Sequence, residues 1–221
     1  VIAFAGDSVH TQTLEQIRAL SQLDEKGKCK NVMIAAPLRL HDCSLVTDGA
    51  AALVVTQTAN VSNRARAVEI AGIGHSAERL AENVRPNMHE LMAGKVAAAK
   101  AYQEAGITAA DIDFAEVHDC FTINLLLSTE ALGLSADGRA GFDLLDGRFT
   151  RDDRCPVNLS GGLKSKGHPV GATGASMHAL AYKQLIGEPI GVAAKKAEIG
   201  VVYNVGGSLV TNCVTVLKAP R

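Results

Sequence analysis

Apolar positions along the chain change between strand-like and helix-like spacing. The strand-like runs cover residues 52–56, 67–73, 114–120 and, as two strands around a Gly-Gly turn, 198–218. Between them, apolar side chains recur at helical spacing over 88–105, 121–132 and 169–186. A polar loop with an excursion is expected over 134–156. Strands that alternate with helices predict an α/β layered domain.

Composition narrows the class of protein. Of 221 residues, 47% are hydrophobic and 20% charged, which is typical of a globular core. The formal net charge is −1 and no dense run of Lys or Arg occurs, which argues against a nucleic-acid partner. No apolar stretch is long enough for a membrane span, and the first residues lack a signal-peptide pattern. Five cysteines without a CxxC pair indicate reduced thiols, so we expect a cytoplasmic location.

The triplet His-Asp-Cys occurs twice, at 41–43 and at 118–120. In the second copy, His118 and Cys120 follow a predicted strand, and residues two apart in extended backbone face the same way. A thiol beside an imidazole can act as base or nucleophile, although a buried Cys with a helix-capping His would fit the same pattern. The first copy reads as structural residues leading into a strand. Two His-x-Cys pairs lack the spacing of zinc sites, so no metal is predicted.

Two glycine-rich segments are further candidates. In "SGGLKSKGHPVGATG", His168 directly precedes Pro169, a favoured first residue of a helix. The positive potential of a helix N-terminus would keep His168 neutral and able to accept a proton, whereas the alternative is an ordinary glycine-rich turn. In "YNVGGSLV", backbone N–H groups near Gly206 could bind an anion, although a plain hairpin explains the segment equally well.

Four segments occur in an order that resembles the C-terminal part of a thiolase: "TDGAAALVV", "EVHDCFTINLLLSTEALGL", "NLSGGLKSKGHPVGATGAS" and "YNVGGSLV". The sterol-carrier-protein type is most similar, because HDCF stands where other thiolases have Asn-Glu-Ala-Phe. The resemblance implies a thiolase-like layered fold, a mixed sheet with helices on both sides, of which this chain is about one half. It divides the chain into a remnant of the covering loop region (1–36), the last strand and helix segment of the N-terminal half (37–58) and the C-terminal half (59–221).

The resemblance also implies roles for individual residues. His168 would activate a nucleophilic cysteine and help to hold the thioester oxyanion, and His118 would position a water in that same oxyanion hole. Cys120 would move the proton at the α-carbon of the substrate. A second group would form the oxyanion and substrate-binding surface: Gly206, Asn204, Ser160 and Gly161. Coenzyme A enters as substrate, and no permanently bound cofactor is implied.

This sequence departs from the family pattern in two places. The Cys-x-Gly turn of most thiolases reads Asn204-Val205-Gly206 here, and the preceding Tyr203 is a possible acid. The nucleophilic cysteine belongs to the N-terminal half, and neither Cys29 nor Cys43 has the expected surroundings. The resemblance therefore implies an acyl-CoA C-acyltransferase, for thiolytic cleavage or Claisen condensation of 3-oxoacyl-CoA, that needs a missing N-terminal half.

Other activities fit the same motifs. The alternatives are a thiolase-fold retro-aldolase acting on a CoA-thioester side chain and a non-catalytic acyl-CoA-binding subunit. The expected partners are the acyl-CoA substrate, the missing half, further copies of the chain in a homo-oligomer, and a small OB-fold, zinc-ribbon chain.

Overall fold

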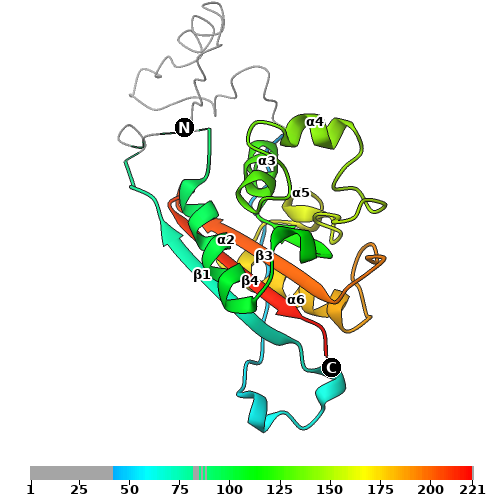
Figure 1. Ribbon diagram of the computed structural model, residues 1–221. Coiled ribbons are helices and arrows are strands. Elements are labelled where there is room, and N and C mark those ends of the chain that lie inside the picture. The colour runs from blue at the N-terminus through cyan, green and yellow to red at the C-terminus, as the bar shows by residue number, and fades with distance from the viewer. Residues whose placement is uncertain (1–41, 82–84, 86, 88, 221) are drawn as a thin grey trace, which may run out of the picture. The chain divides into compact units, whose positions relative to one another are not determined.

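The computed structural model describes residues 42–81, 85, 87 and 89–220 (Figure 1). The chain divides into two compact units, 1–43 and 44–221, and the second unit contains every element described below. The predicted loop remnant at 1–36 lies outside the described residues. The predicted boundary at 58 stays a prediction.

A four-stranded mixed sheet forms the centre of the second unit. Its strands, in the spatial order β1-β4-β3-β2, are β1 (Glu69–Ala77), β4 (Thr211–Lys218), β3 (Ile199–Gly206) and β2 (Phe114–Val117). β2 and β3 are parallel, whereas β3 pairs antiparallel with β4 and β4 with β1. The β3–β4 connection is the predicted glycine turn, with Gly207 at positive φ. The sheet is therefore mixed, as predicted.

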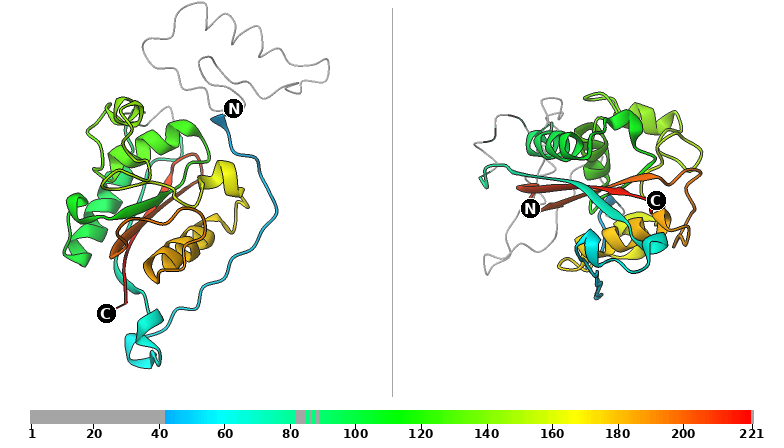
Figure 2. Two further views of the ribbon diagram at one scale, coloured as in Figure 1. Left: turned by 90° about the vertical axis from the view of Figure 1, so that its right-hand side faces the viewer. Right: turned by 60° about the horizontal axis from the view of Figure 1, so that its bottom comes forward.

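Helices cover both faces of this sheet. The α-helices are α2 (Met92–Ala105), α3 (Thr122–Ala131), α4 (Ala140–Leu145), α5 (Gly162–Lys166) and α6 (Thr173–Leu185), and short 3-10 turns are η2 (Thr58–Asn60), η3 (Arg64–Arg66) and η5 (Ala109–Asp111). α2 packs on β1 and β4, and α6 lies on the opposite face against β3 and β2 (Figure 2). Among the described residues, no helix has the length and apolar character needed to cross a bilayer.

Small residues set the distance between α2 and the sheet. Ala97 and Ala101 of α2 are fully buried against Gly72 and Gly74 of β1. A Cβ atom at Gly74 would lie 1.7 Å from the carbonyl oxygen of Ala97, and one at Gly72 would lie 2.2 Å from that of Ala101. Helix and strand backbones can approach this closely only because both glycines lack a side chain.

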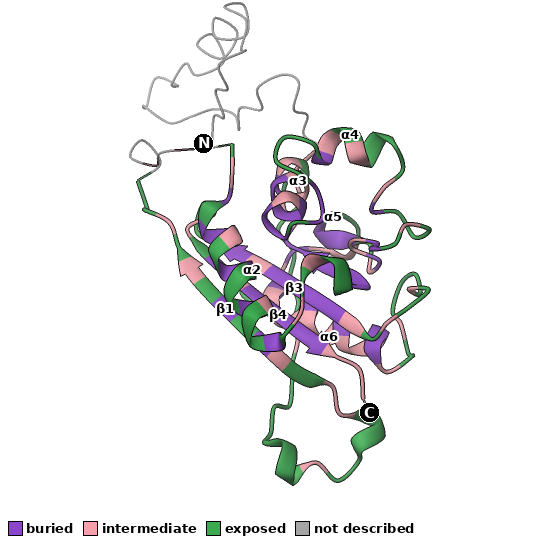
Figure 3. Cartoon of the chain, in the orientation of Figure 1, coloured by how far each residue is buried: buried purple, intermediate pink, exposed green. Residues whose placement is uncertain are grey.

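Larger apolar side chains fill the other face. Phe114 of β2 packs with Met177 and Ala181 of α6 and with Val202 and Leu217 of the two central strands. β3 and β4 are buried along most of their length, as Figure 3 shows, whereas the edge strand β1 alternates between exposed and buried positions. This alternation is expected of a strand with one face on the core.

The strand predicted at 52–56 is absent. These residues form no ladder with any described strand, and Val54 is 97% exposed and Val55 70% exposed. A run of β-branched residues becomes a strand only where a neighbouring strand pairs with its N–H and C=O groups. Within the part of the chain that the structure describes, the segment has no such neighbour, so it forms no strand here.

The helix predicted at 169–186 begins later than expected, at Thr173. A backbone bridge between Val46 and His168 keeps His168 extended, and the carbonyl of Pro169 first closes a turn with the N–H groups of Ala172 and Thr173. His168 therefore does not sit directly at a helix N-terminus. Other bounds also shift by a few residues: α2 begins at Met92, and the strand predicted at 67–73 is β1, 69–77.

Candidate active site

The segment between β2 and α3 carries the second His-Asp-Cys triplet. β2 ends at Val117, whose N–H donates to Asn158 Oδ1 at 2.7 Å. The next N–H, that of His118, donates to the carbonyl of Tyr203 at 3.0 Å and continues the parallel pairing with β3. The triplet therefore lies at the carboxyl end of two parallel strands, where sites in α/β sheets gather.

His118 is bound through one ring nitrogen to β3. Its Nδ1 lies 2.7 Å from Oδ1 of Asn204, and a carbonyl oxygen can only accept, so Nδ1 carries the proton. The neutral ring therefore presents a lone pair at Nε2. Burial, above all, lowers the pKa of His118 to about 4, so the ring is neutral near pH 7.

His168 is held in an equivalent way by a different part of the chain. Its Nδ1 lies 2.8 Å from the hydroxyl of Thr173, and that hydroxyl donates to the carbonyl of Pro169 at 3.0 Å. The hydroxyl oxygen thus accepts the Nδ1 proton, and Nε2 of His168 is again a free lone pair. Burial, together with the positive charge of Lys166, lowers the pKa of His168, so it too is neutral near pH 7. Burial and the charge of Lys166, and not a helix N-terminus, therefore account for the neutral state of His168.

The fold brings the two imidazoles together. The ring centroids of His118 and His168 lie 5.0 Å apart with the rings edge to face at 85°. One ligand atom from each ring and Sγ of Cys120 all lie within 4.8 Å of one another. The three residues predicted to be catalytic thus form one cluster, although 48 positions separate Cys120 from His168 in the sequence.

Cys120 is a protonated thiol in this cluster. Nδ2 of Asn124, one helical turn further on in α3, donates to Sγ at 3.0 Å. Burial is the main cause that raises the pKa of Cys120 to about 11, and the Asn124 hydrogen bond opposes it only in part. At neutral pH the thiol therefore has a proton to give, and it is not a preformed thiolate nucleophile.

Two carboxyl groups, of buried Glu116 and half-buried Asp119, hold the glycine-rich loop beside the cluster. Asp119 accepts the N–H of Leu163 at the start of α5 at 2.8 Å. Glu116, 1% exposed, accepts both the hydroxyl and the N–H of Ser160, at 2.6 and 3.2 Å. Burial raises the pKa of both carboxyl groups. Sequence reasoning did not single out these carboxyl groups, because an Asp inside the motif and a Glu in an apolar strand give no signal of their partner.

The predicted oxyanion and substrate-binding residues lie in different environments. Both polar groups of Ser160 are engaged by Glu116, and the N–H of Gly161 donates to the carbonyl of Asn158 at 2.9 Å. Gly206 is exposed at the end of β3, with open space where a Cβ would lie, on the same face as Asn204. Asn204 contacts the cluster directly, through its hydrogen bond with His118.

Tyr203 is not placed to act as an acid. Its side chain is fully buried, and its hydroxyl donates to Oδ1 of Asn212 at 2.6 Å. Burial raises its pKa well above the ordinary value. Because neighbouring residues of a strand face opposite sides, Tyr203 points away from the face that Asn204 shares with His118.

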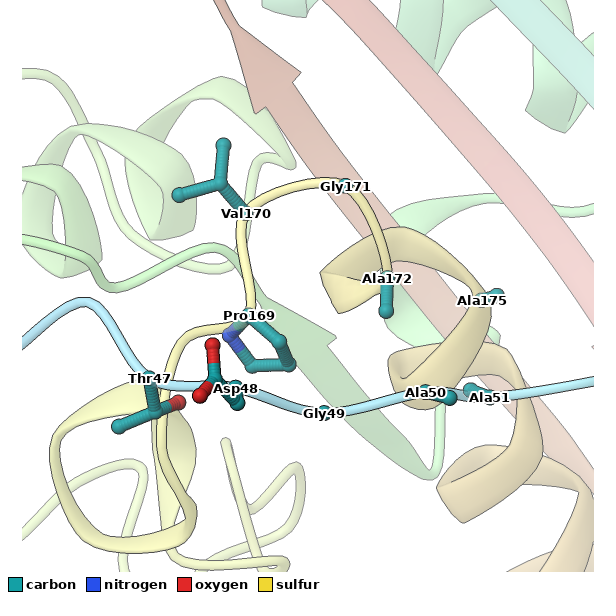
Figure 4. Close-up of a pocket in the computed structure, with 10 residues that line it drawn as sticks. All are labelled: Thr47, Asp48, Gly49, Ala50, Ala51, Pro169, Val170, Gly171, Ala172 and Ala175. Atoms are coloured by element: carbon teal, nitrogen blue, oxygen red, sulfur yellow. The ribbon is translucent and has the colours of Figure 1, made fainter.

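The extended segment after residue 43 supports both site loops. The N–H of Ser44 donates to the carbonyl of Cys120 at 2.8 Å, and the N–H of Thr47 to that of His168 at 3.3 Å. Figure 4 shows residues 47–51 running beside 169–172 across a shallow pocket lined mainly by small side chains. A Cβ at Gly49 would lie 2.8 Å from Cγ of Pro169, so this close passage requires glycine.

Comparison with known proteins identifies the family. Residues 72–219 match the family model described as "Thiolase C-terminal domain-like", and the chain belongs to this family. It is 39% identical over 179 residues to the acetyl-CoA acetyltransferase of Methanothermobacter thermautotrophicus, a match that covers 80% of this chain and 47% of that protein. It is 34% identical over 201 residues to sterol carrier protein 2 of Rattus norvegicus, covering 84% of this chain and 36% of that one. The resemblance inferred from the motifs is confirmed.

A solved structure has the same fold. The structure entitled "Ltp2-ChsH2(DUF35) aldolase" superposes with a TM-score of 0.71 at 20% identity, over 87% of this chain and 50% of that one. The chain spans half or less of the length of each of these three proteins.

Proposed function

We propose that this chain provides the proton-transfer and oxyanion-binding part of a thiolase-type acyl-CoA C-acyltransferase. The observation that carries the proposal is the convergence of two neutral imidazoles, each with a free Nε2, on one half-buried thiol, that of Cys120. Acyl transfer through a thioester needs a base for the attacking thiol, an acid for the leaving carbanion and donors for an oxyanion. In the cluster, His168 is the base, Cys120 is the acid, and His168 becomes an oxyanion donor once it has taken a proton.

In thiolytic cleavage, the attacking thiol comes from a cysteine outside this chain. Nε2 of His168 takes the proton of that thiol, and the sulfur attacks the keto carbon of 3-oxoacyl-CoA. The bond between the α-carbon and the keto carbon then breaks, and its electron pair forms the enolate of the departing CoA thioester. Cys120 donates its thiol proton to the α-carbon, which leaves an acyl-cysteine, a free thioester and the Cys120 thiolate.

The second half of the reaction restores both groups. Free CoA gives its thiol proton to the Cys120 thiolate and attacks the acyl-cysteine. The cysteine sulfur leaves and takes its proton back from the His168 imidazolium. Within the first half, before Cys120 protonates the α-carbon, that imidazolium is a hydrogen-bond donor for the enolate oxyanion, and His118 positions a water in the same place.

Exchange of the α-proton tests this assignment most directly. The assay follows deuterium uptake into acetyl-CoA in D2O by the longest natural polypeptide that contains this sequence. Cys120→Ala should lower the exchange rate about 10²–10⁴-fold, as expected for removal of a general acid–base group. Cys213→Ser, which changes a half-buried thiol on β4, should leave the rate unchanged. An undiminished rate in Cys120→Ala would refute the role of Cys120.

A thiolase-fold retro-aldolase is the second candidate. The observation in its favour is that Asn204, bound to His118, stands in the turn where most thiolases carry a cysteine. An aldolase forms no acyl-cysteine, so intact-mass analysis after rapid quenching with acyl-CoA separates the two activities. A mass increase of one acyl group supports the acyltransferase, and cleavage of a β-hydroxyacyl-CoA without that increase supports the aldolase. A homo-oligomer, an OB-fold partner and a cytoplasmic location stay predictions.

A further inference from the structure

We infer that His118, Cys120 and His168 form a binding site for one thiophilic divalent cation of the Zn²⁺ type, which blocks the active site when it binds. The sequence did not predict a metal here, because the two triplets lack zinc-site spacing. The structure instead combines one triplet with a histidine from a different loop. A His₂Cys set is a donor set that Zn²⁺ accepts.

The geometry is close to that of a metal site. The three ligand atoms all lie within 4.8 Å of one another. Zn–N and Zn–S bonds of about 2.0–2.3 Å in a tetrahedron put ligand atoms roughly 3.3–3.8 Å apart. Movements of about 1 Å in the side chains therefore suffice to enclose the ion.

Both histidines are already oriented for coordination. Metal-binding histidines usually donate their second ring N–H to a neighbouring oxygen, which fixes the tautomer and the ring orientation. Here Asn204 accepts from His118 Nδ1 and Thr173 accepts from His168 Nδ1. In each ring, Nε2 therefore carries the lone pair that can bind the ion.

The thiol completes a three-ligand set with an open fourth position. Cys120 loses its proton to solvent when the metal binds, and the amide of Asn124 already donates to Sγ, which stabilises the thiolate. Lys166 is a nearby positive charge, which the carboxyl groups of Glu116 and Asp119 offset. The metal-competent group found among the described residues contains no carboxylate. A water or the thiol of CoA would therefore take the fourth position.

Such binding would inhibit the enzyme. The metal would occupy Nε2 of His168 and Sγ of Cys120, which are the atoms that accept and donate protons in the proposed reaction. This inhibitory consequence rests on the proposed function, whereas binding itself does not. Metal binding can therefore be tested without an activity assay.

Titration of the purified protein with Co²⁺ tests the site. We expect one Co²⁺ per chain, with the near-ultraviolet thiolate-to-cobalt charge-transfer absorption of a Co–S bond, and displacement of Co²⁺ by Zn²⁺. Cys120→Ser should abolish this absorption, and Thr173→Val should weaken binding about 10–100-fold because it removes the Nδ1 partner of His168. Far-ultraviolet circular dichroism establishes that each variant is folded.

Cys213→Ser is the matched control. Cys213 lies opposite His75 in the β1–β4 pairing, which makes this pair the alternative thiol–imidazole combination on the described sheet. The control should bind Co²⁺ with unchanged absorption. Absence of the charge-transfer band in the parent protein, its persistence in Cys120→Ser, or its loss in Cys213→Ser would each overturn the proposal.

Inhibition is measured separately. In a thiolysis assay Zn²⁺ should inhibit competitively with CoA, and a chelator should restore the rate. Binding of Co²⁺ by a protein without thiolysis or proton exchange would refute the proposed function and leave the metal site intact. Full activity with no Co²⁺ binding would refute the metal site alone.

Discussion

At the scale of single residues, hydrogen bonding and burial give the cluster its protonation states. Asn204 and Thr173 each accept the Nδ1 proton of one imidazole, so the free lone pair of each ring is on Nε2. Burial disfavours the charged form of every member, lowering the pKa of His118 and raising that of Cys120. Near pH 7 the resting cluster therefore consists of two neutral bases and one neutral acid.

The lowered pKa of His118 predicts a pH dependence of stability. An unfolded histidine has a pKa of about 6.5, whereas that of folded His118 is about 4, so between these values the unfolded chain binds more protons. The stability is fully present above about pH 6.5 and falls as the pH is lowered toward 4. The loss is on the order of 3 kcal/mol for a shift of this size.

Urea unfolding of the parent protein and of His118→Asn at pH 7, 6, 5 and 4 measures this loss. The parent should lose more free energy of unfolding than the variant over that range, because the variant lacks the titrating ring. His168 remains in both proteins, so its own titration contributes to both slopes. Equal slopes against pH in the two proteins would show that His118 titrates normally in the folded state.

At the scale of elements, the site depends on how closely backbone segments approach one another. The triplet lies at the end of β2, and His168 lies in a loop whose backbone is bridged to Val46. Glu116 and Asp119 accept hydrogen bonds from residues 160 and 163, which holds the 160–163 turn at the end of β2. On the face of the sheet opposite α6, Gly72 and Gly74 allow the backbone of α2 to approach β1 closely.

This close packing predicts a strong effect of a side chain at Gly74. In Gly74→Val, the new Cβ atom would overlap the carbonyl oxygen of Ala97, so α2 and β1 must move apart. We expect a loss of at least about 1–3 kcal/mol in the free energy of unfolding, as found for overpacked cores. Gly141→Ala in α4 is the control, since its Cβ would meet the nearest atom at 3.8 Å and alanine favours a helix.

Chemical denaturation of the two glycine variants gives the comparison. The control should be as stable as the parent or slightly more stable. If Gly74→Val were as stable as the control, the close approach of α2 to β1 would be wrong.

At the scale of the whole molecule, the chain contains a thiolase C-terminal domain-like region at residues 72–219. It spans less than half of the length of its relatives from Methanothermobacter thermautotrophicus and Rattus norvegicus. Its sheet and the helices on both faces carry the cluster. The apolar run at 52–56 is largely exposed and pairs with no strand of this sheet. We interpret it as a strand of the N-terminal thiolase half.

Hydrogen exchange tests this interpretation. Amides of 52–56 should exchange rapidly in the 221-residue chain, because no described strand pairs with them. In a longer natural polypeptide that includes the preceding half, the same amides should become protected. The amides of β4 serve as the reference, since they are paired on both sides and should be protected in both proteins. Rapid exchange of 52–56 in the longer polypeptide would contradict the assignment.

The sequence by itself determined the α/β class, the α3 helix that ends before Gly133, the β3–β4 hairpin and the family. These features depend on local periodicity, on glycines at turns and on motifs whose order can be read directly. The sequence also singled out His118, Cys120 and His168, because reactive side chains stood beside glycines or at a strand end.

Only the tertiary structure decided which of these residues meet. The sequence cannot show that Asn204 and Thr173 fix the two tautomers or that burial, rather than a helix N-terminus, keeps His168 neutral. Nor can it show that Tyr203 faces away from the cluster. It assigned a strand to 52–56 because propensity records how a side chain fits a sheet and not whether a neighbouring strand is present. Distances between loops far apart in sequence arise from packing, which local pattern does not encode.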